Sequence, residues 1–344
     1  MAVIALTTAQ GNIGINCIDI QPDNSRIVIG CEDGNIKYYR FEAIHKDQCI
    51  LTCSSSIFGG GGITAIKYSK VKLNNEYMIA CGSSEGYIEL ITRREIRPEK
   101  WSNLAGSKLH TYDIKDIEWI NQDIISCGID NIIYICHVSC NEDGFRLKIS
   151  RKIRAHEGWV TGLAVLNNFI LSQGSENKVK VWNYPSFAQV LEIRYEQEEA
   201  DEESVEVIRK PSAGLWFALA GTRSGRTGEG CLTILRPENW NIIEIPLSLI
   251  SSEGDTNILL KRKRHEENVV EVLCSGFLNK GLLVVTSGGY LSLFSYIDFT
   301  MIWETMLQPA AEITDLATAS DGNWAVLSSA EGLPFYVTFE ENLN

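Results

Sequence analysis

The stretch His156–Trp182, HEGWVTGLAVLNNFILSQGSENKVKVW, decides the fold. It contains three short apolar runs, Val160–Val165, Phe169–Leu171 and Val179–Trp182, which are joined by turns rich in Gly, Ser and Asn. Apolar and polar residues alternate along these runs, as is typical of half-buried strands. We therefore predict three strands that pair in sequence order through tight turns.

Four polar groups stand at fixed offsets in this stretch, namely His156, Ser172, Glu176 and Trp182. The indole N–H only donates, the hydroxyl donates and accepts, the imidazole has one nitrogen of each kind, and the carboxylate accepts. If the strands pair in order, these groups form one hydrogen-bond chain across the sheet. Such a chain satisfies polar atoms that are costly to bury without partners.

On these residues the stretch resembles a WD40 repeat. Ala155-His156 stands where that family has Gly-His, Glu176 takes the place of the turn aspartate, and Trp182-Asn183 corresponds to Trp-Asp. The resemblance implies a four-stranded blade in which this structural tetrad stabilises the sheet. It also implies a non-catalytic protein-interaction platform.

The strand–turn–strand pattern recurs along the whole chain. First strands begin at residues 15, 63, 114, 160, 205, 270 and 313. This spacing corresponds to the WD40 period of roughly 40–45 residues with loop insertions, and a fourth short run separates most units. We predict one all-β domain over 1–344, a seven-bladed WD40-type propeller. The spare run Ala2–Leu6 is expected to pair into the last blade as its outer strand, and only unit four carries a near-complete tetrad.

Composition limits the classes of protein and the compartment. Hydrophobic residues make up 44% of the chain, but no run approaches the length of a membrane span, and the N-terminus lacks the features of a signal peptide. The ten cysteines fit buried, reduced thiols, so we expect an intracellular protein of the cytoplasm or nucleus. A net charge of −13 argues against a general nucleic-acid binder, although it leaves a local basic patch open. The basic run Lys261–His265 is a nuclear-import signal, a contact for an acidic partner, or neither.

Catalytic, metal and cofactor motifs are not recognised in the sequence. Ser172, His156 and Glu176 resemble a hydrolase triad, but the WD40 resemblance implies that these groups bond to each other inside a blade. The segment Gly221–Gly230 lacks the GK[ST] ending of a phosphate loop, so we expect a long loop between the second and third strands of blade five. Thr92-Arg93-Arg94-Glu95 is not the Phe-Arg-Arg-Gly signature of phosphoinositide-binding propellers, and no membrane role is expected.

In propellers, the loops that enter each inner strand share one face, the top face, with the turns between second and third strands. Trp159 precedes an inner strand and is expected on the rim of that face, where aromatic residues often anchor interfaces. Asp113 and Glu312 are expected at the same rim position of blades three and seven. The acidic run 196–203 and the loop of blade five are assigned to this face as well; the candidate partner-binding residues they contribute are Glu198, Glu199, Asp201, Arg223 and Arg226.

Two functions remain open after the sequence alone. The first is a scaffold subunit, a monomeric ring within a larger protein complex. The second is a reader of basic peptides or histone tails through the acidic top face near blades four and five. The charge runs also have a simpler interpretation as solvated loops.

Overall fold

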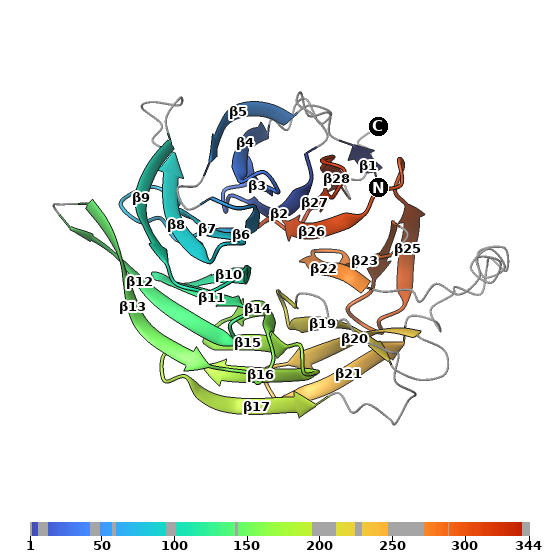
Figure 1. Cartoon of the computed structure of the whole chain (residues 1–344). Helices are drawn as coiled ribbons and strands as arrows, with labels where there is room; N and C mark the ends of the chain where they lie inside the picture. Colours follow the sequence, from blue (N-terminus) through green and yellow to red (C-terminus); the bar gives the residue numbers. More distant parts are fainter. Residues whose placement is uncertain are drawn as a thin grey trace.

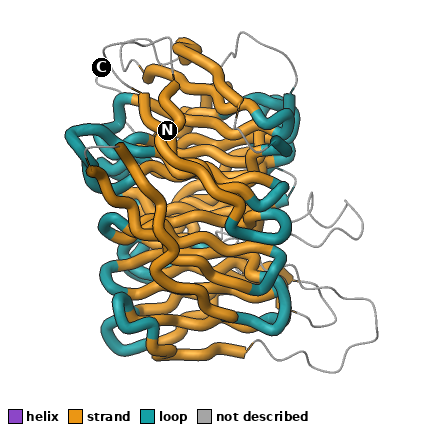
Figure 2. The backbone as a smooth tube through the Cα atoms, turned by 60° about the vertical axis from the view of Figure 1, so that its left-hand side comes forward, coloured by secondary structure: helices purple, strands orange, loops and turns teal. Residues whose placement is uncertain are grey.

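The computed structural model describes residues 2–5, 13–41, 49–56, 60–93, 101–141, 144–194, 211–223, 229–246, 272–287 and 289–338. Every regular element within these ranges is a β-strand, and the strands form seven four-stranded sheets. The sheets are arranged as blades around a ring (Figure 1). Seen from the side, the connecting loops gather at two opposite faces of this ring (Figure 2). The predicted seven-bladed β-propeller is therefore confirmed.

Blades one to four each use four consecutive strands, which pair in sequence order. Their strands are β2 (Ile15–Ile20), β3 (Arg26–Cys31), β4 (Asn35–Phe41) and β5 (Cys49–Ser56); β6 (Ile63–Tyr68), β7 (Ile79–Ser83), β8 (Tyr87–Arg93) and β9 (Trp101–Lys108); β10 (Ile114–Ile120), β11 (Asp123–Gly128), β12 (Ile132–Asn141) and β13 (Gly144–Arg154); β14 (Val160–Leu166), β15 (Phe169–Gly174), β16 (Lys178–Asn183) and β17 (Ala188–Arg194). The first strand of each blade lies innermost, next to the first strand of the neighbouring blade.

Blades five to seven complete the ring. Their strands are β18 (Ser212–Ala213), β19 (Phe217–Arg223), β20 (Glu229–Arg236) and β21 (Asn241–Pro246); β22 (Val272–Leu278), β23 (Gly281–Thr286), β24 (Tyr290–Phe294) and β25 (Met301–Met306); β26 (Ile313–Thr318), β27 (Trp324–Ser329), β28 (Phe335–Thr338) and β1 (Ala2–Ala5). Strand β1 is the outer strand of blade seven, with Ala2 opposite Thr338 and Ala5 opposite Phe335. The two ends of the chain thus share one sheet.

The hydrophobic core is divided among the blade interfaces. Among the described residues, the buried side chains form seven apolar clusters, and each cluster joins one pair of neighbouring blades. Between blades two and three, for example, Ala80 and Ile88 pack with Ile114 and Ile117. Because side chains alternate between the two sides of a strand, every blade contributes one apolar side to each neighbour. The period-two pattern of the sequence has this origin.

Polar contacts between inner strands also fix the ring. Asp116 Oδ2 of blade three accepts a hydrogen bond from the backbone N–H of Leu163 in blade four, at 2.9 Å. Asp315 Oδ2 of blade seven accepts one from the N–H of Ile18 in blade one, at 3.2 Å. Both carboxylates are buried, so these hydrogen bonds satisfy groups that would otherwise be costly to bury.

Blade five differs from its prediction. The expected first run, Val205–Ile208, lies outside the described residues, and the innermost described strand is β18. The expected loop Gly221–Gly230 is also wrong at both ends, because Gly221 pairs with Cys231 and Arg223 pairs with Glu229. Glycine and polar residues still offer backbone N–H and C=O groups, so the hairpin extends through them. Arg223 ends a strand, and Arg226 lies outside the described residues.

Candidate interaction face

The tetrad of blade four forms a continuous hydrogen-bond chain. The indole N–H of Trp182 donates to Ser172 Oγ at 2.9 Å, and Ser172 Oγ lies 2.8 Å from His156 Nε2. His156 Nδ1 lies 2.7 Å from Glu176 Oε1. Since Glu176 accepts, Nδ1 carries the proton and Nε2 accepts the hydroxyl hydrogen of Ser172. The chain therefore links strands β15 and β16, the turn between them and the segment before β14.

The electrostatics of this chain favour a neutral imidazole beside a charged carboxylate. Burial lowers the pKa of His156, and the hydrogen bond and charge of Glu176 offset this only in part. Burial alone would raise the pKa of Glu176, but its hydrogen bonds, including those from His156 and from the N–H of Glu157, hold that pKa below its ordinary value. This relay of His156, Ser172, Glu176 and Trp182 is thus an arrangement of hydrogen bonds that ends at one half-buried, negatively charged acceptor.

The geometry does not suit nucleophilic chemistry. Ser172 is completely buried, and its hydroxyl already bonds to both His156 and Trp182. A nucleophile needs an approach path for its substrate. The Ser–His–Glu set therefore acts on the structure of the blade.

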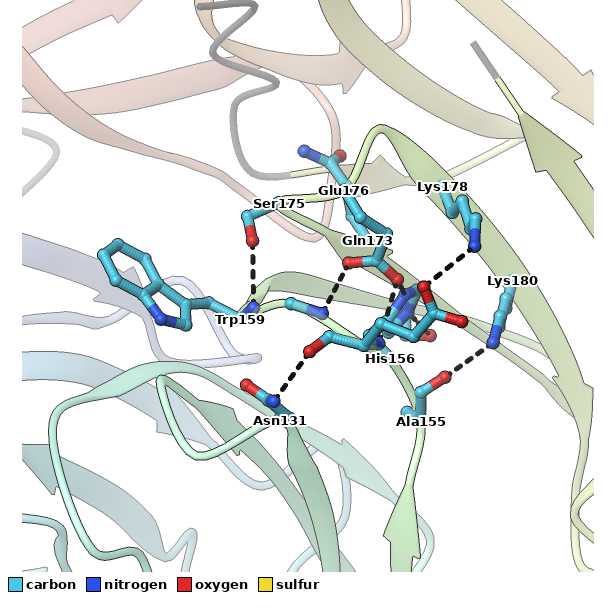
Figure 3. Close-up of polar contacts among 12 residues, drawn as sticks. Asn131, Ala155, His156, Trp159, Gln173, Ser175, Glu176, Lys178 and Lys180 are labelled. Atoms are coloured by element: carbon cyan, nitrogen blue, oxygen red, sulfur yellow. Dashed lines mark hydrogen bonds and ion pairs between the residues drawn. The ribbon is translucent and has the colours of Figure 1, made fainter. Parts of the chain in front are cut away.

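Glu176 also fixes the turn that precedes the inner strand. Its Oε1 accepts from the N–H of Glu157 at 3.3 Å, and its Oε2 accepts from the N–H of Gly158 at 3.2 Å. Ser175 fixes the backbone of Trp159 through two hydrogen bonds. Its Oγ accepts from the N–H of Trp159 at 2.9 Å, and its own N–H donates to Trp159 O at 2.8 Å. Figure 3 shows the indole of Trp159 pointing away from His156. The relay thereby presents a 51% exposed aromatic side chain on a fixed backbone.

The rim position of Trp159 recurs in other blades. In five blades the residue before the inner strand accepts, through its carbonyl, a backbone N–H from the turn between the second and third strands. These residues are Gly14, Gly62, Asp113, Trp159 and Glu312, in blades one, two, three, four and seven. Trp159 and Asp113 therefore lie on neighbouring blades, whereas Glu312 belongs to blade seven, on another part of the ring.

The two acidic rim residues have different surroundings. Asp113 Oδ2 lies 2.5 Å from Lys115 Nζ, while its Oδ1 is buried without a hydrogen-bond partner. Glu312 is exposed, and its N–H donates to the carboxylate of Glu331. The charge of Glu312 is thus available to solvent, and that of Asp113 is partly compensated.

A second relay, in blade three, is absent from the sequence prediction. His110 Nδ1 lies 2.9 Å from Asp130 Oδ1, and His110 Nε2 lies 2.9 Å from Ser126 Oγ. The expectation that only unit four carries a near-complete tetrad is therefore wrong, because blade three keeps the histidine, the serine and the acid. The offsets from histidine to serine and to acid are 16 and 20 residues in both blades, which is the signal that identifies the pair. The turn held by this relay presents Tyr112, which is 60% exposed.

The top face is acidic without the predicted acidic run. Glu198, Glu199 and Asp201 lie outside the described residues. Other exposed acids occupy the described turns of this face; they are Glu32, Asp33, Glu85, Glu157 and Glu331. Among them, Glu157 lies 3.5 Å from Lys178 Nζ. The described top face therefore combines exposed carboxylates with the two aromatic side chains of blades three and four.

The C-terminal ends of the inner strands, opposite the top-face turns, have another character. A cavity of about 450 Å³ lies there, and Lys67 Nζ is placed within it 3.6 Å from Asp19 and 3.7 Å from Glu118. Burial raises the pKa of Asp19 in spite of Lys67. Within the described ranges, no group of three or more His, Cys, Asp or Glu residues is arranged to hold a metal ion. The same part of the chain contains no helix long and apolar enough to span a bilayer.

Comparisons with known proteins agree with this geometry. The family model described as WD domain, G-beta repeat matches residues 5–40, which include β2, β3 and most of β4 in blade one. Protein hir1 of Schizosaccharomyces pombe (strain 972 / ATCC 24843) is 24% identical over 364 aligned positions, which cover 96% of this chain and 36% of hir1. The chain thus spans about a third of the length of this relative. The repeat match in blade one, the similarity to hir1 and the seven-bladed ring agree on one fold, a WD40-type β-propeller.

Proposed function

We propose that the propeller is a protein-interaction scaffold and that its top face binds a basic segment of a partner around Trp159. The observation that carries this proposal is the exposed indole on a backbone held by Glu176 and Ser175. Aromatic side chains that are fixed before binding lose little conformational entropy on contact, and they are frequent energetic anchors of interfaces.

The charge of the partner follows from the turns around the indole. Glu157 lies in the turn before β14. Glu85 lies in the turn between the second and third strands of blade two, and Glu32 and Asp33 lie in the same turn of blade one. A lysine- or arginine-rich segment that crosses blades one to four meets carboxylates along its path. Complementary charge raises the association rate and discriminates against acidic partners.

We further propose that the ring acts as one subunit of a larger protein complex. Propellers present two faces and an outer rim, so several partners can bind one ring. In hir1 the region similar to this chain occupies 36% of the polypeptide, which shows a similar sequence as one part of a larger protein. Whether the partners of this ring are stable subunits or transient peptides is the question for experiment.

The alternative within the same site is a reader of histone tails or other basic peptides. The acidic top face favours it, because such tails are rich in lysine and arginine. A scaffold and a reader differ in salt dependence, since contacts between exposed charges weaken as ionic strength rises.

The first experiment measures peptide binding by fluorescence anisotropy, with lysine- and arginine-rich peptides that include histone-tail sequences. We expect Trp159→Ala to weaken binding by about tenfold or more, as removal of an interface anchor does. Ile297→Ala is the matched control, because Ile297 is 93% exposed in the turn between β24 and β25, away from the top-face turns. Equal affinity of the Trp159 variant and the wild type contradicts the proposed site.

The second experiment purifies the full chain with its native partners in low and high salt. A stoichiometric complex that survives high salt supports the scaffold subunit. Binding that is limited to basic peptides and lost in high salt supports the reader. Recovery of the chain without partners, together with no peptide binding, contradicts both.

A further inference from the structure

Strand β13, the outer strand of blade three, is strongly basic in a chain with a net charge of −13. Its sequence GFRLKISRKIR holds five cationic residues and no acidic one. The cations are Arg146, Lys148, Arg151, Lys152 and Arg154, and all five are exposed. The acids Glu142 and Asp143 precede the strand in the chain and lie outside the described residues.

The outer strands of the other blades do not share this charge. Strands β1 and β5 have no charged residue, β9 has only Lys108, and β17 pairs one acid with one base, Glu192 and Arg194. Strands β21 and β25 each carry a single acid. Charges on edge strands commonly prevent edge-to-edge aggregation, but that role would apply to every blade. The basic character of β13 therefore calls for a specific cause.

The free edge of β13 also extends beyond those of other blades. A bulge interrupts the outer strand pair in five blades, and in blade three it lies between Ile149 and Arg151. Before that bulge, β13 pairs six residues, Gly144 to Ile149, whereas the corresponding segments of β5, β9, β17 and β25 pair three, three, two and one. Figure 1 shows the β12–β13 hairpin reaching outward at the rim of the ring. This segment thus has an outer edge that pairs with no described strand.

Contacts with the β16–β17 turn of blade four and with blade three itself hold two of the cations along the strand. Arg151 Nη1 donates to Ser186 O at 2.7 Å, and its guanidinium lies 5.0 Å from the ring centre of Phe187. Lys152 Nζ lies 5.1 Å from the ring centre of Tyr134. On the protruding segment, Ile149 is 49% exposed beside Lys148. The edge therefore offers backbone hydrogen-bonding groups, fixed positive charge and an apolar contact together.

We propose that an extended acidic segment of a partner protein adds to blade three as a fifth strand along β13. Strand addition satisfies the unpaired N–H and C=O groups of a sheet edge, and flanking side chains provide specificity. A nucleic acid matches the cations but not the alternating donors and acceptors of the edge, and the strongly negative chain repels it at long range. The site is separate from the top face, so its failure leaves the function proposed for Trp159 standing.

The first test uses the full chain and an eight-residue peptide of alternating Glu and Thr, with binding measured by fluorescence anisotropy. Two further peptides carry N-methyl groups on the odd or on the even residues, which removes backbone donors from one edge of the peptide and leaves its charge unchanged. An added strand pairs through one edge only, so one methylated peptide should bind like the parent and the other should lose at least tenfold in affinity. Equal affinity of all three peptides overturns strand addition.

The second test is the double variant Lys148→Glu with Arg154→Glu. We expect the affinity for the parent peptide to fall about tenfold, because two favourable charge contacts become repulsive. The control is Lys108→Glu with Arg194→Glu, which changes the net charge equally on the outer strands of the neighbouring blades and should leave the affinity within about twofold. An equal loss in both variants contradicts a site on β13.

Two further measurements complete the design. The first is the affinity for a single-stranded oligonucleotide. If the oligonucleotide binds more tightly than the peptide, and only the β13 variant loses this binding, the choice of a protein partner is overturned. Hydrogen exchange of the β12–β13 amides with and without peptide is the readout that does not depend on substitutions. Slower exchange confined to this hairpin supports the proposal, and unchanged exchange at saturating peptide contradicts it.

Discussion

Blades three and four solve the same packing problem in two ways. Both hold a buried histidine between a serine and an acid, at identical sequence offsets. In blade four the third strand supplies Trp182, whose indole N–H closes the relay on Ser172. In blade three the same third-strand position is Cys136, because Ile124 pairs with Cys136 as Ile170 pairs with Trp182. A histidine relay therefore does not require the tryptophan.

Blade three has its tryptophan on the inner strand and not on the third strand. The residues that lie opposite one another on the first three strands form a row across each blade. In blade three, Trp119 of the inner strand lies opposite Ile124, and in blade four Val165 lies opposite Ile170. The indole N–H of Trp119 donates to Lys67 O of blade two at 3.1 Å. One tryptophan per row fills the space in either blade, but in blade three it links neighbouring blades, and in blade four it completes the relay.

The largest expected effect comes from exchanging the two arrangements. Trp119→Val should destabilise the protein by about 3 kcal/mol, since it empties a buried site and removes an interblade hydrogen bond. Cys136→Trp alone should cost about 1–3 kcal/mol through overpacking. The double variant restores one tryptophan to the row, so chemical denaturation should show a smaller loss than the sum of the single losses. Strict additivity would show that the row is not one packing unit.

A smaller difference is expected from the two serines. Ser172→Ala leaves both the Trp182 indole N–H and His156 Nε2 without their partner, whereas Ser126→Ala removes the hydrogen bond to His110 Nε2. Each buried polar group left unsatisfied costs about 1–3 kcal/mol. Thermal unfolding should therefore show the larger loss for Ser172→Ala. Equal losses would indicate that the indole N–H finds another acceptor.

The smallest effect is the pH dependence of the blade-four relay. Burial keeps the pKa of His156 below its unfolded value near 6.5, so the folded state favours the neutral ring. The unfolded state then binds more protons, and this contribution to stability is present above about pH 6.5 and is lost as the pH falls below it. Wild-type unfolding midpoints should drop between pH 7.5 and 5.5 more steeply than those of His156→Gln. Equal pH dependence of the unfolding midpoints in the wild type and in His156→Gln would contradict this role of His156.

The sequence predicts features whose signals are local. Alternation and turn residues placed the blades, because each strand pairs with its immediate neighbours in the chain. His110 escaped recognition because its blade keeps no tryptophan at the Cys136 position, although its offsets to Ser126 and Asp130 match those of blade four. The pairing of Arg223 with Glu229 could not be predicted from composition. It depends on backbone hydrogen bonds, which form in a glycine-rich segment regardless of its side chains.

The acidic character of the top face was predicted from the run 196–203, which lies outside the described residues, whereas the described carboxylates of this face are scattered along the chain. Charge runs are conspicuous in a sequence, whereas Glu32, Glu85 and Glu331 stand far apart and converge only when the ring is assembled. These carboxylates lie on one face because their turns lie on that face of the ring. An isolated acidic residue in the sequence does not indicate which face its turn will occupy. The exposed position of Trp159 could be expected, because the residue before an inner strand has a defined place on the rim.

The pairing of β1 with β28 has a consequence for synthesis on the ribosome. Residues 2–5 emerge before the other strands of the ring, and their partner, residues 335–338, emerges after those strands. At about 5–20 residues per second, the first strand waits on the order of 20–70 s before its sheet can form. Until then six blades have emerged in order while the opening strand remains a bare edge, open to chaperones or to a neighbouring nascent chain.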